Sequence, residues 1–250
     1  MKAVIFNSGI GNRMGTFTDH NHKSMSRLSN GETIFHRQLR ILSAEGIQDF
    51  VVTTGPFEEQ LKSEAADFPQ LNITFVRNDI HYKTNYIYSM YLAREYMDDD
   101  ILFFHGDLVF NRKLIHDVLN CSDPNTGTVN LNTAQPEKDF KARVRDGKLL
   151  EVSVRIFDAD CYAFQPFYKM DRTTAGAWIG KVAEFIQRGE DKCYAENALN
   201  EIFADLNVRA FSYDGYYIDE IDNLEDHARV TREIQPFDEA DAKHFDCGEL

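Results

Sequence analysis

The first 107 residues alternate between short apolar runs and longer amphipathic segments, and this alternation constrains the fold more than any other feature of the sequence. The strand-like runs are residues 2–6, 50–55, 73–78 and 101–107, and the helix-like segments between them are 33–47, 58–68 and 86–97. In the first helix-like segment, apolar residues recur at helical intervals and Gly46 is placed to end the helix. Alternating strands and helices predict a mostly parallel sheet with helices on both faces.

The second half of the chain changes character. Short, β-branched stretches within residues 126–154 predict a small antiparallel insert. The later elements are predicted as helices at 177–189 and 195–206, two strands within 208–222, and a closing helix at 223–234 capped by Asn223. Residues 235–250 lack a clear period and are predicted to form a loosely held tail of a single domain spanning 1–250. The predicted fold class is α/β, Rossmann-like, with a mostly parallel, mixed central sheet flanked by helices.

Composition narrows the classes of partner. A formal net charge of -14 argues against a nucleic-acid or anionic-membrane surface, so a phosphate site would depend on a few individual cations. Four widely spaced cysteines without CxxC spacing are typical of reduced thiols. No run approaches the length of a membrane span or a secretory signal core, and we expect a cytoplasmic protein. The sequence makes no prediction of oligomeric state.

The loop after the first strand carries the clearest chemical signal. Gly9 and Gly11 let the backbone approach a ligand, and successive N–H groups in such a turn cradle anionic oxygens. Arg13 and Lys23 add positive charge, and a triphosphate fits this arrangement. Met14 and His22 occupy positions where the dinucleotide fingerprint and the P-loop, respectively, need glycine, which excludes both motifs. A tight strand-to-helix turn with solvated cations is the alternative.

Two further loops are expected beside this one, because ligands of open parallel sheets bind beyond the carboxyl ends of the strands. One loop holds Gly106 and Asp107, and the other holds Glu220 and Asp222. The three loops together are the predicted functional site.

The stretch NSGIGNRMG, followed by HKSM, resembles the signature of nucleotidyltransferases with a glycosyltransferase-A-like fold. The resemblance extends through residues 33–55 and 84–110 and resumes at EIDNLED, and it is strongest to bacterial choline-phosphate and phosphonate cytidylyltransferases. The chain departs from the signature where Asn7 and Ser8 replace alanines, His22 replaces proline and Pro56 replaces a common tyrosine.

The resemblance implies that an acceptor phosphate or phosphonate attacks the α-phosphorus of CTP and releases pyrophosphate. It implies Mg²⁺ as cofactor, bound by Asp107 and Asp222, with Glu220 as a further ligand or an acceptor contact. Arg13 and Lys23 are the expected catalytic cations on the β- and γ-phosphates. The expected lining of the nucleotide site is Asn7, Ser8, Gly9, Gly11, Thr54, Gly55 and Gly106.

The acceptor side is expected at Asn85 and Tyr86, in the segment that resembles the substrate-side helix of the family. A choline group would need an aromatic or acidic box, for which the chain offers many tyrosines. Lys141 and Arg143 are either contacts to the acceptor phosphate or exposed strand cations. We assign no catalytic role to His20, His22 or His105, although His105 lies close enough to Asp107 to contact a ligand.

Three other functions remain open from sequence. A sugar-1-phosphate nucleotidylyltransferase is the nearest alternative. A glycosyltransferase would use an Asp-x-Asp pair, which Asp158 and Asp160 provide, but it would leave Arg13 and Lys23 without a triphosphate. A catalytically silent nucleotide-binding module would not need the cations and carboxylates that this chain retains.

Overall fold

The structure is a computed structural model that describes residues 1–133 and 137–246. The strands are β1 (Lys2–Asn7), β2 (Asp49–Thr54), β3 (Asn72–Arg77), β4 (Ile101–His105), β5 (Leu108–Phe110), β6 (Thr126–Asn130), β7 (Lys141–Arg145), β8 (Lys148–Ser153), β9 (Cys161–Met170), β10 (Arg209–Ser212) and β11 (Ile218–Glu220). The α-helices are α1 (Ile34–Ala44), α2 (Glu58–Ala65), α3 (Tyr86–Ala93), α4 (Arg112–Asn120), α5 (Arg172–Gln187), α6 (Ala195–Asn200), α7 (Leu224–Glu233) and α8 (Gln235–Asp246). The 3₁₀ helices are η1 (Asn12–Asp19), η2 (Lys23–Met25), η3 (Arg94–Tyr96) and η4 (Phe203–Asp205).

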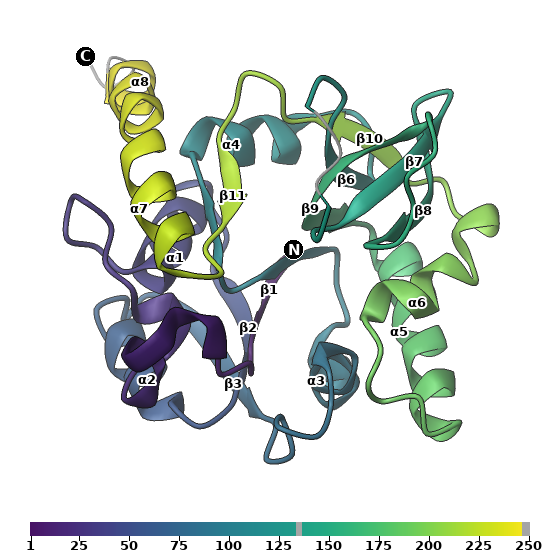
Figure 1. Cartoon of the computed structure of the whole chain (residues 1–250), viewed down its shortest axis with the longest axis horizontal. Coiled ribbons are helices and arrows are strands. Elements are labelled where there is room, and N and C mark those ends of the chain that lie inside the picture. Colours follow the sequence, from purple (N-terminus) through teal and green to yellow (C-terminus); the bar gives the residue numbers. More distant parts are fainter. Residues whose placement is uncertain (134–136, 247–250) are drawn as a thin grey trace.

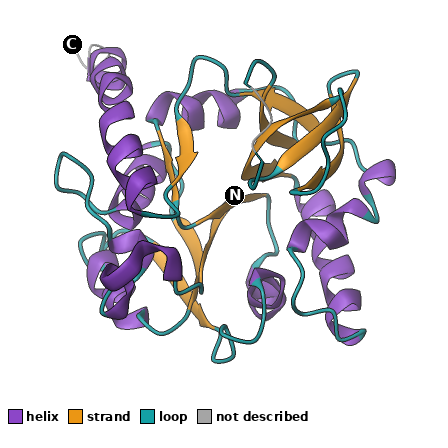
Figure 2. Ribbon diagram, in the orientation of Figure 1, coloured by secondary structure: helices purple, strands orange, loops and turns teal. Residues whose placement is uncertain are grey.

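A nine-stranded mixed sheet runs through the molecule in the order β3-β2-β1-β4-β9-β6-β10-β8-β7. Strands β1 to β4 are parallel, whereas β9 runs antiparallel to both β4 and β6. Strand β11 pairs with β5 in a separate two-stranded ribbon. The predicted mixed α/β sheet is confirmed, and the later part of the predicted antiparallel insert is the β7–β8 hairpin (Figure 2). Its first stretch is instead β6, which lies inside the central sheet and is parallel to β10.

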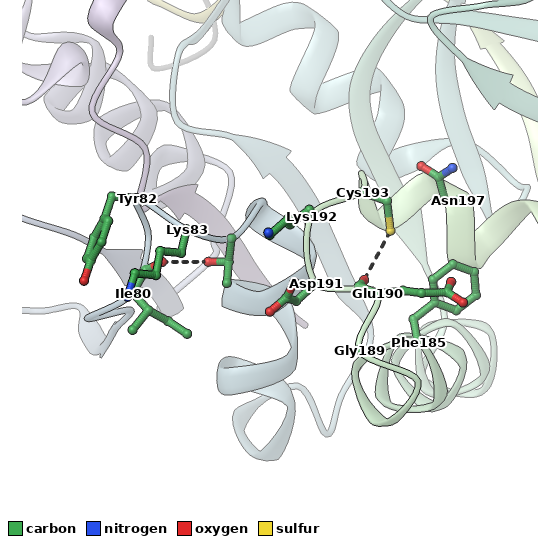
Figure 3. A pocket seen from close by; sticks show the side chains of 11 residues that line it. Ile80, Tyr82, Lys83, Phe185, Gly189, Glu190, Asp191, Lys192, Cys193 and Asn197 are labelled. Carbon is green, nitrogen blue, oxygen red and sulfur yellow. Dashed lines mark hydrogen bonds between the residues drawn. The ribbon is translucent and has the colours of Figure 1, made fainter.

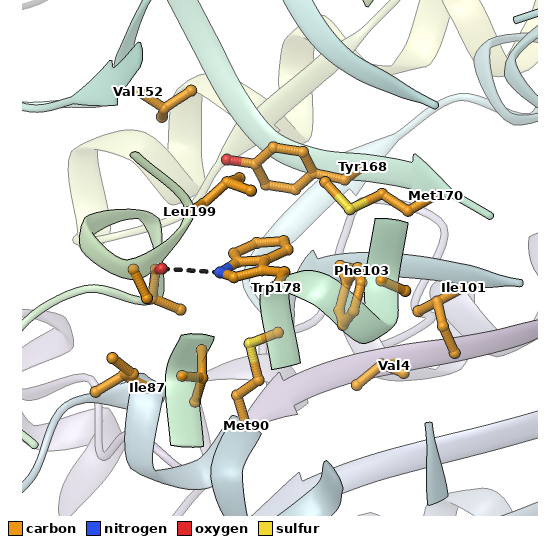
Figure 4. Close-up of a cluster of buried hydrophobic side chains, with 14 of the residues drawn as sticks. Val4, Ile87, Met90, Ile101, Phe103, Val152, Tyr168, Met170, Trp178 and Leu199 are labelled. Atoms are coloured by element: carbon orange, nitrogen blue, oxygen red, sulfur yellow. Dashed lines mark hydrogen bonds between the residues drawn. The ribbon is translucent and has the colours of Figure 1, made fainter. Parts of the chain in front are cut away.

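The two faces of β1 bury different side chains, as the period of a strand requires. Val4 and Phe6 join a cluster with α3, α5 and α6, in which Trp178 donates a hydrogen bond from Nε1 to the Ala195 carbonyl at 2.9 Å (Figure 4). Ala3 and Ile5 join a second cluster with α1 and α4. Figure 1 shows α1 and α2 on one side of β1–β3 and α3 on the other. Both faces are therefore covered, and the ligand-accessible part of the sheet is its strand ends.

Helix boundaries follow the local signals. Gly46 has φ 86° and ends α1, and the side chain of Asn223 accepts hydrogen bonds from Glu225 N and Asp226 N at the start of α7, so both predictions are confirmed. Residues 235–246, predicted as a loosely held tail, form α8 instead. They are ordered because Asp238 pairs with the buried Arg37 and Asp241 binds the start of α4. Residues 247–250 of the expected tail lie outside the described residues. Within the described part of the chain, no helix is both long and apolar enough to span a bilayer.

Candidate active site

The three predicted loops meet because the strands that precede them end side by side. Phe6 of β1 is in register with His105 of β4, so that Asn7 lies beside Gly106 and Asp107. Glu220 of β11 is in register with Leu108 of β5, and the N–H of Ile221 donates to the Asp107 carbonyl at 3.1 Å. This pairing brings the carboxylates of residues 107 and 222 to one edge of the sheet. The two residues are more than a hundred positions apart in the chain.

The glycine loop places a lysine against these carboxylates. Gly11 has φ 75°, a conformation that side chains disfavour, and a Cβ at this position would lie 2.9 Å from Cβ of Lys23. Lys23 begins η2, whose N-cap is His22; Nδ1 of His22 accepts from Ser24 N at 3.1 Å. The close approach of Gly11 and the cap by His22 together fix the position of Lys23.

Four predicted residues share one charge network. Nζ of Lys23 lies 2.5 Å from Asp107 Oδ2 and 2.9 Å from Asp222 Oδ1, and Nη2 of Arg13 lies 2.8 Å from Asp222 Oδ2. The Lys23 side chain is 12% exposed, whereas that of Arg13 is 69% exposed. Arg13 is therefore free to change partner at little cost, while Lys23 is a fixed cation within the site.

Burial and the opposing charges decide the ionisation of this network. Burial acts to lower the pKa of Lys23, but Asp107 and Asp222 raise it well above its ordinary value. Burial acts to raise the pKa of Asp107, but Lys23 and His105 hold it below its usual range. The ammonium and the Asp107 carboxylate are therefore both charged at neutral pH.

The oxygens near Lys23 suit a hard divalent cation. Ligand atoms of Asp139, Glu220 and Asp222 lie within 4.8 Å of one another, as do those of His105, Asp107 and Glu220. Oδ1 of Asp107 is buried and has no hydrogen-bond partner among the described residues. Carboxylate oxygens are the donors that Mg²⁺ prefers, so the residues present fit such an ion. The two predicted ligands, Asp107 and Asp222, belong to different groups that share Glu220, and Asp139 was not predicted.

Of the remaining residues predicted to line the nucleotide site, only the glycines at 9, 11 and 106 and Asn7 line a cavity beside this network. Ser8 Oγ donates to Thr53 Oγ1 at 2.9 Å, and a Cβ on Gly55 would approach the Ser8 carbonyl to 2.4 Å, so Gly55 permits close packing of the two loops. The Thr54 hydroxyl is already engaged, since it donates to Glu58 Oε2 at 2.6 Å. Gly9, Gly11 and Gly106 line a small cavity of about 90 Å³ together with Phe6, Asn7, His22, Lys23, Ser24 and Asp107.

An aromatic cluster with buried carboxyl groups adjoins the charge network. Tyr86 packs edge-on against His105 with ring centroids 4.7 Å apart, and Phe140 packs against Tyr194 at 5.0 Å. The Tyr86 hydroxyl donates to the buried Glu196, which also accepts from Tyr168 at 3.3 Å. Burial raises the pKa of Glu196. We call the set Tyr86, His105, Phe140, Tyr194 and Glu196 the aromatic cluster.

Only part of the aromatic cluster was foreseen. The sequence predicts Tyr86 as an acceptor contact and assigns His105 no catalytic role. It does not predict Glu196, because nothing in the helical segment of this residue marks it as buried. Glu220, also predicted, lies 3.5 Å from Nδ1 of His105. Burial, together with the charge of Asp107, raises the pKa of Glu220 to about 7.

Asn85 is the N-cap residue of α3. Its Oδ1 accepts from the N–H of Tyr86 at 2.7 Å and caps α3, and its own N–H donates to the Asp191 carbonyl at 2.8 Å. The predicted contact of Asn85 with the acceptor stays a prediction, whereas its contribution to the orientation of Tyr86 follows from this geometry.

The Asp-x-Asp pair of the glycosyltransferase alternative belongs to another part of the molecule. Arg143 binds both Asp158 and Asp160, at 2.5 and 2.7 Å, and Arg145 binds Asp160 at 2.7 Å. Lys141 is buried and donates to the Val154 carbonyl at 2.7 Å. Ligand atoms of Asp158, Asp160 and Cys161 lie within 4.8 Å of one another in the segment between β8 and β9, but Arg143 and Arg145 already engage the two carboxylates.

A wide cavity of about 1070 Å³ opens elsewhere, between the β3–α3 and α5–α6 loops (Figure 3). Tyr82, Lys83, Asp191 and Lys192 are among its lining residues. None of the predicted site residues lines it, and its charges are exposed side chains of both signs. Size alone does not make it the reaction site, because the convergent cations and carboxylates lie at the strand ends.

Known proteins show the same fold and similar sequences. The family model of the MobA-like NTP transferase domain matches residues 3–155, which is more than half of the chain. CMP-5'-(3-aminopropyl)phosphonate synthase of Streptomyces rubellomurinus is 27% identical over 71% of this chain, and the match spans 26% of that longer protein. Choline-phosphate cytidylyltransferase of Streptococcus pneumoniae is 22% identical over 92% of this chain and 96% of its own length.

One solved structure extends the comparison to three dimensions. CTP:phosphocholine cytidylyltransferase from Streptococcus pneumoniae superimposes with a TM-score of 0.77 at 20% sequence identity, covering 94% of this chain and 99% of that one. At this identity the likeness shows a shared fold.

Proposed function

This chain belongs to the MobA-like NTP transferase family, and from that premise we propose that it transfers CMP from CTP to a small phospho-alcohol or phosphonate that carries a positive charge. The observation that carries the proposal is the meeting of Arg13 and Lys23 with Asp107 and Asp222 at one strand edge. CTP is proposed because two relatives act in CMP transfer, as their names state.

The reaction joins two anions, and the residues serve that task. An oxygen of the acceptor phosphate or phosphonate forms a bond to the α-phosphorus, and the bond from that phosphorus to the β-phosphate oxygen breaks to release pyrophosphate. The attacking oxygen is already ionised near neutral pH, so charge neutralisation and alignment matter more than a general base.

Each charged residue has a part in this chemistry. The exposed guanidinium of Arg13 can exchange Asp222 for the outer phosphates, and the ammonium of Lys23 stabilises the charge that develops as pyrophosphate leaves. Asp107 and Asp222 would hold Mg²⁺, which supplies further charge neutralisation when bound.

The aromatic cluster supports an acceptor with an ammonium or trimethylammonium group. Aromatic faces attract cations, and two acidic side chains adjoin the cluster: Glu196 bonds to Tyr86, and Glu220 lies 3.5 Å from His105, on which Tyr86 packs. Phosphocholine and 2-aminoethylphosphonate both combine such a cation with the required anion. A hexose phosphate, whose sugar carries no positive charge, would leave this side of the site without a matching charge.

A pyrophosphate-release screen tests the proposal. Each ribonucleoside triphosphate is paired with phosphocholine, 2-aminoethylphosphonate, glycerol phosphate and hexose 1-phosphates, with and without Mg²⁺. The expected result is release only with CTP, Mg²⁺ and a cationic acceptor, and a loss of at least about 100-fold in Asp107→Asn. Asp123→Asn, at an exposed position outside the site, is the matched control and should retain the wild-type rate. Release only with UTP and a hexose phosphate would instead identify a sugar-1-phosphate enzyme.

A further inference from the structure

Asn7, the last residue of β1, has a buried carboxamide whose hydrogen-bonding groups are unsatisfied. It is 2% exposed, and neither Oδ1 nor Nδ2 has a hydrogen-bond partner within residues 1–133 and 137–246. Its backbone is fixed, since its N–H donates to Thr53 Oγ1 at 3.2 Å. A buried amide without partners destabilises the fold, and such groups in folded proteins usually have a functional reason.

The carboxamide is aimed at the strand-end cavity. A Cβ on Gly106 would lie 1.7 Å from Asn7 Oδ1, so the carboxamide lies directly over Gly106 and requires glycine there. Asn7, Gly106, Lys23 and Asp107 line the same small cavity. Asn7 therefore points to the place where the triphosphate and the metal would meet.

The carboxamide of Asn7 has both a donor and an acceptor, and this limits which group of a nucleotide can satisfy it. An ionised phosphate can only accept hydrogen bonds, so it would satisfy Nδ2 and leave Oδ1 without a donor. A hydroxyl both donates and accepts, and two vicinal hydroxyls can satisfy both ends of the carboxamide. The edge of cytosine also offers a donor and an acceptor, but the base lies at the far end of the nucleoside from the α-phosphate. The ribose is separated from that phosphate by a single methylene.

We propose that the carboxamide of Asn7 binds the ribose hydroxyls of the nucleotide and so makes the enzyme select ribonucleotides over deoxyribonucleotides. This inference rests on the proposed function for the identity of the ligand. The alanine of the family signature has no group that could make this contact, so the selectivity would be a property of this chain's own residue.

Steady-state kinetics with sugar-modified nucleotides test the inference. The wild-type protein should show a kcat/KM for CTP that is about tenfold or more above that for 2′-deoxy-CTP or 3′-deoxy-CTP, as expected for one lost hydrogen bond. Asn7→Ala should bring these ratios close to one without changing the CTP to UTP ratio. An unchanged sugar ratio in Asn7→Ala overturns the inference, and a changed CTP to UTP ratio alone would assign Asn7 to the base.

Asn125 provides a matched control, because its buried amide is fully bonded within the protein. Its Nδ2 donates to Asp171 Oδ2 at 3.0 Å and its Oδ1 accepts from Asp171 N at 2.8 Å. Asn125→Ala should lower the midpoint of thermal unfolding and keep the sugar ratios. Asn7→Ala should leave that midpoint unchanged or raise it, since no bond within the fold is lost; a fall as large as that of Asn125→Ala contradicts the inference.

A binding measurement separates this inference from the proposed function. In the wild-type protein with Mg²⁺, CTP should raise the unfolding midpoint more than 2′-deoxy-CTP does, and in Asn7→Ala the two shifts should be equal. Absence of pyrophosphate release by the wild-type protein with every acceptor would reject the proposed function, while equal shifts by the two nucleotides in the wild type would reject the role of Asn7.

Discussion

Lys23 lies between the two carboxylates that would hold a divalent cation. Its ammonium contacts Asp107 and Asp222 and is almost shielded from solvent. The ammonium attracts both carboxylates strongly, because electrostatic interactions inside a protein are screened less than those at its surface. Any ion that binds these oxygens therefore competes with Lys23 for them.

The first prediction follows from this competition. Lys23→Met removes the buried cation that Asp107 and Asp222 share and leaves Asp222 paired only with the exposed Arg13, so Mg²⁺ should raise the thermal unfolding midpoint of the variant more than that of the wild type. The same variant should lose about 100- to 1000-fold in kcat, because a charge that stabilises the leaving pyrophosphate is gone. Lys83→Met, in the wide cavity of Figure 3, is the control and should behave as the wild type in both assays. Equal Mg²⁺ shifts in all three proteins would contradict the placement of the ion.

His22 links the glycine loop to η2 and gives the fold a specific pH dependence. Burial lowers its pKa from 6.5 to about 4. The folded state thus binds the proton more weakly than the unfolded chain. The contribution of His22 to the free energy of unfolding is therefore fully present above pH 6.5 and is lost as the pH falls toward 4. At 1.4 kcal/mol per pH unit, the loss amounts to about 3 kcal/mol.

The second prediction compares His22→Gln with the wild type by urea unfolding between pH 7.5 and pH 4.5. The free energy of unfolding should fall less steeply with decreasing pH in the variant, because glutamine does not titrate. His20→Gln, which replaces an exposed ring of the same loop, should retain the wild-type curve. A His22→Gln curve parallel to that of the wild type would show that the histidine contributes nothing to this slope.

At the level of elements, α8 is bound to the start of α4 through one side chain. The carboxylate of Asp241 accepts from Asn111 Nδ2 at 3.0 Å and from the N–H groups of Arg112 and Lys113 at 2.5 and 3.3 Å. Asn111 does not cap α4 itself, because its Oδ1 accepts from Tyr217 N at 3.0 Å. A residue 129 positions away in the sequence therefore supplies the cap that the local sequence does not.

The third prediction is that Asp241→Ala lowers the free energy of unfolding by about 1–2 kcal/mol, as the loss of a helix cap usually does. Glu239→Ala, at an exposed position on the same helix, should change it by less than about 0.5 kcal/mol. Urea unfolding monitored by circular dichroism measures both. Equal stability of the two variants would mean that α8 does not hold α4 through Asp241.

The elements that the sequence did not predict have physical reasons for being obscure. β9 contains Pro166, which argues against a central strand, and the structure accommodates it where the register between β6 and β9 shifts at Gly127/Thr128. α4 could have been found, since Leu114, Ile115 and Val118 recur at helical spacing. α8 could not, because its order depends on Arg37 and Asn111, which are distant in sequence.

At the level of the whole molecule, the strand-end rule predicts that the three loops lie together, and the fold does bring residues 13, 23, 107 and 222 into one network. The acceptor side was less accessible to sequence reasoning. Glu196 and Tyr194 reach the aromatic cluster only because α6 packs beside α3 and α5. Such packing has no local signature, whereas glycines, cations and carboxylates at strand ends do.

The cations of the β7–β8 region and those of the strand-end network differ in their partners. Arg143 binds three carboxylates, those of Glu151, Asp158 and Asp160, and Arg145 binds Asp160. At the strand ends, by contrast, Arg13 is exposed and Lys23 is next to unsatisfied oxygens. In a chain with net charge -14, an anion bound at this edge would depend on these two individual cations.

A crystal structure with Mg²⁺ and the non-hydrolysable α,β-methylene analogue of CTP tests the central claim most directly. The account predicts the ion on Asp107 and Asp222, the phosphates on Arg13 and Lys23, and the ribose against Asn7. A nucleotide bound in the wide cavity beside Lys83 and Lys192, with no contact to residues 13, 23, 107 and 222, would contradict it.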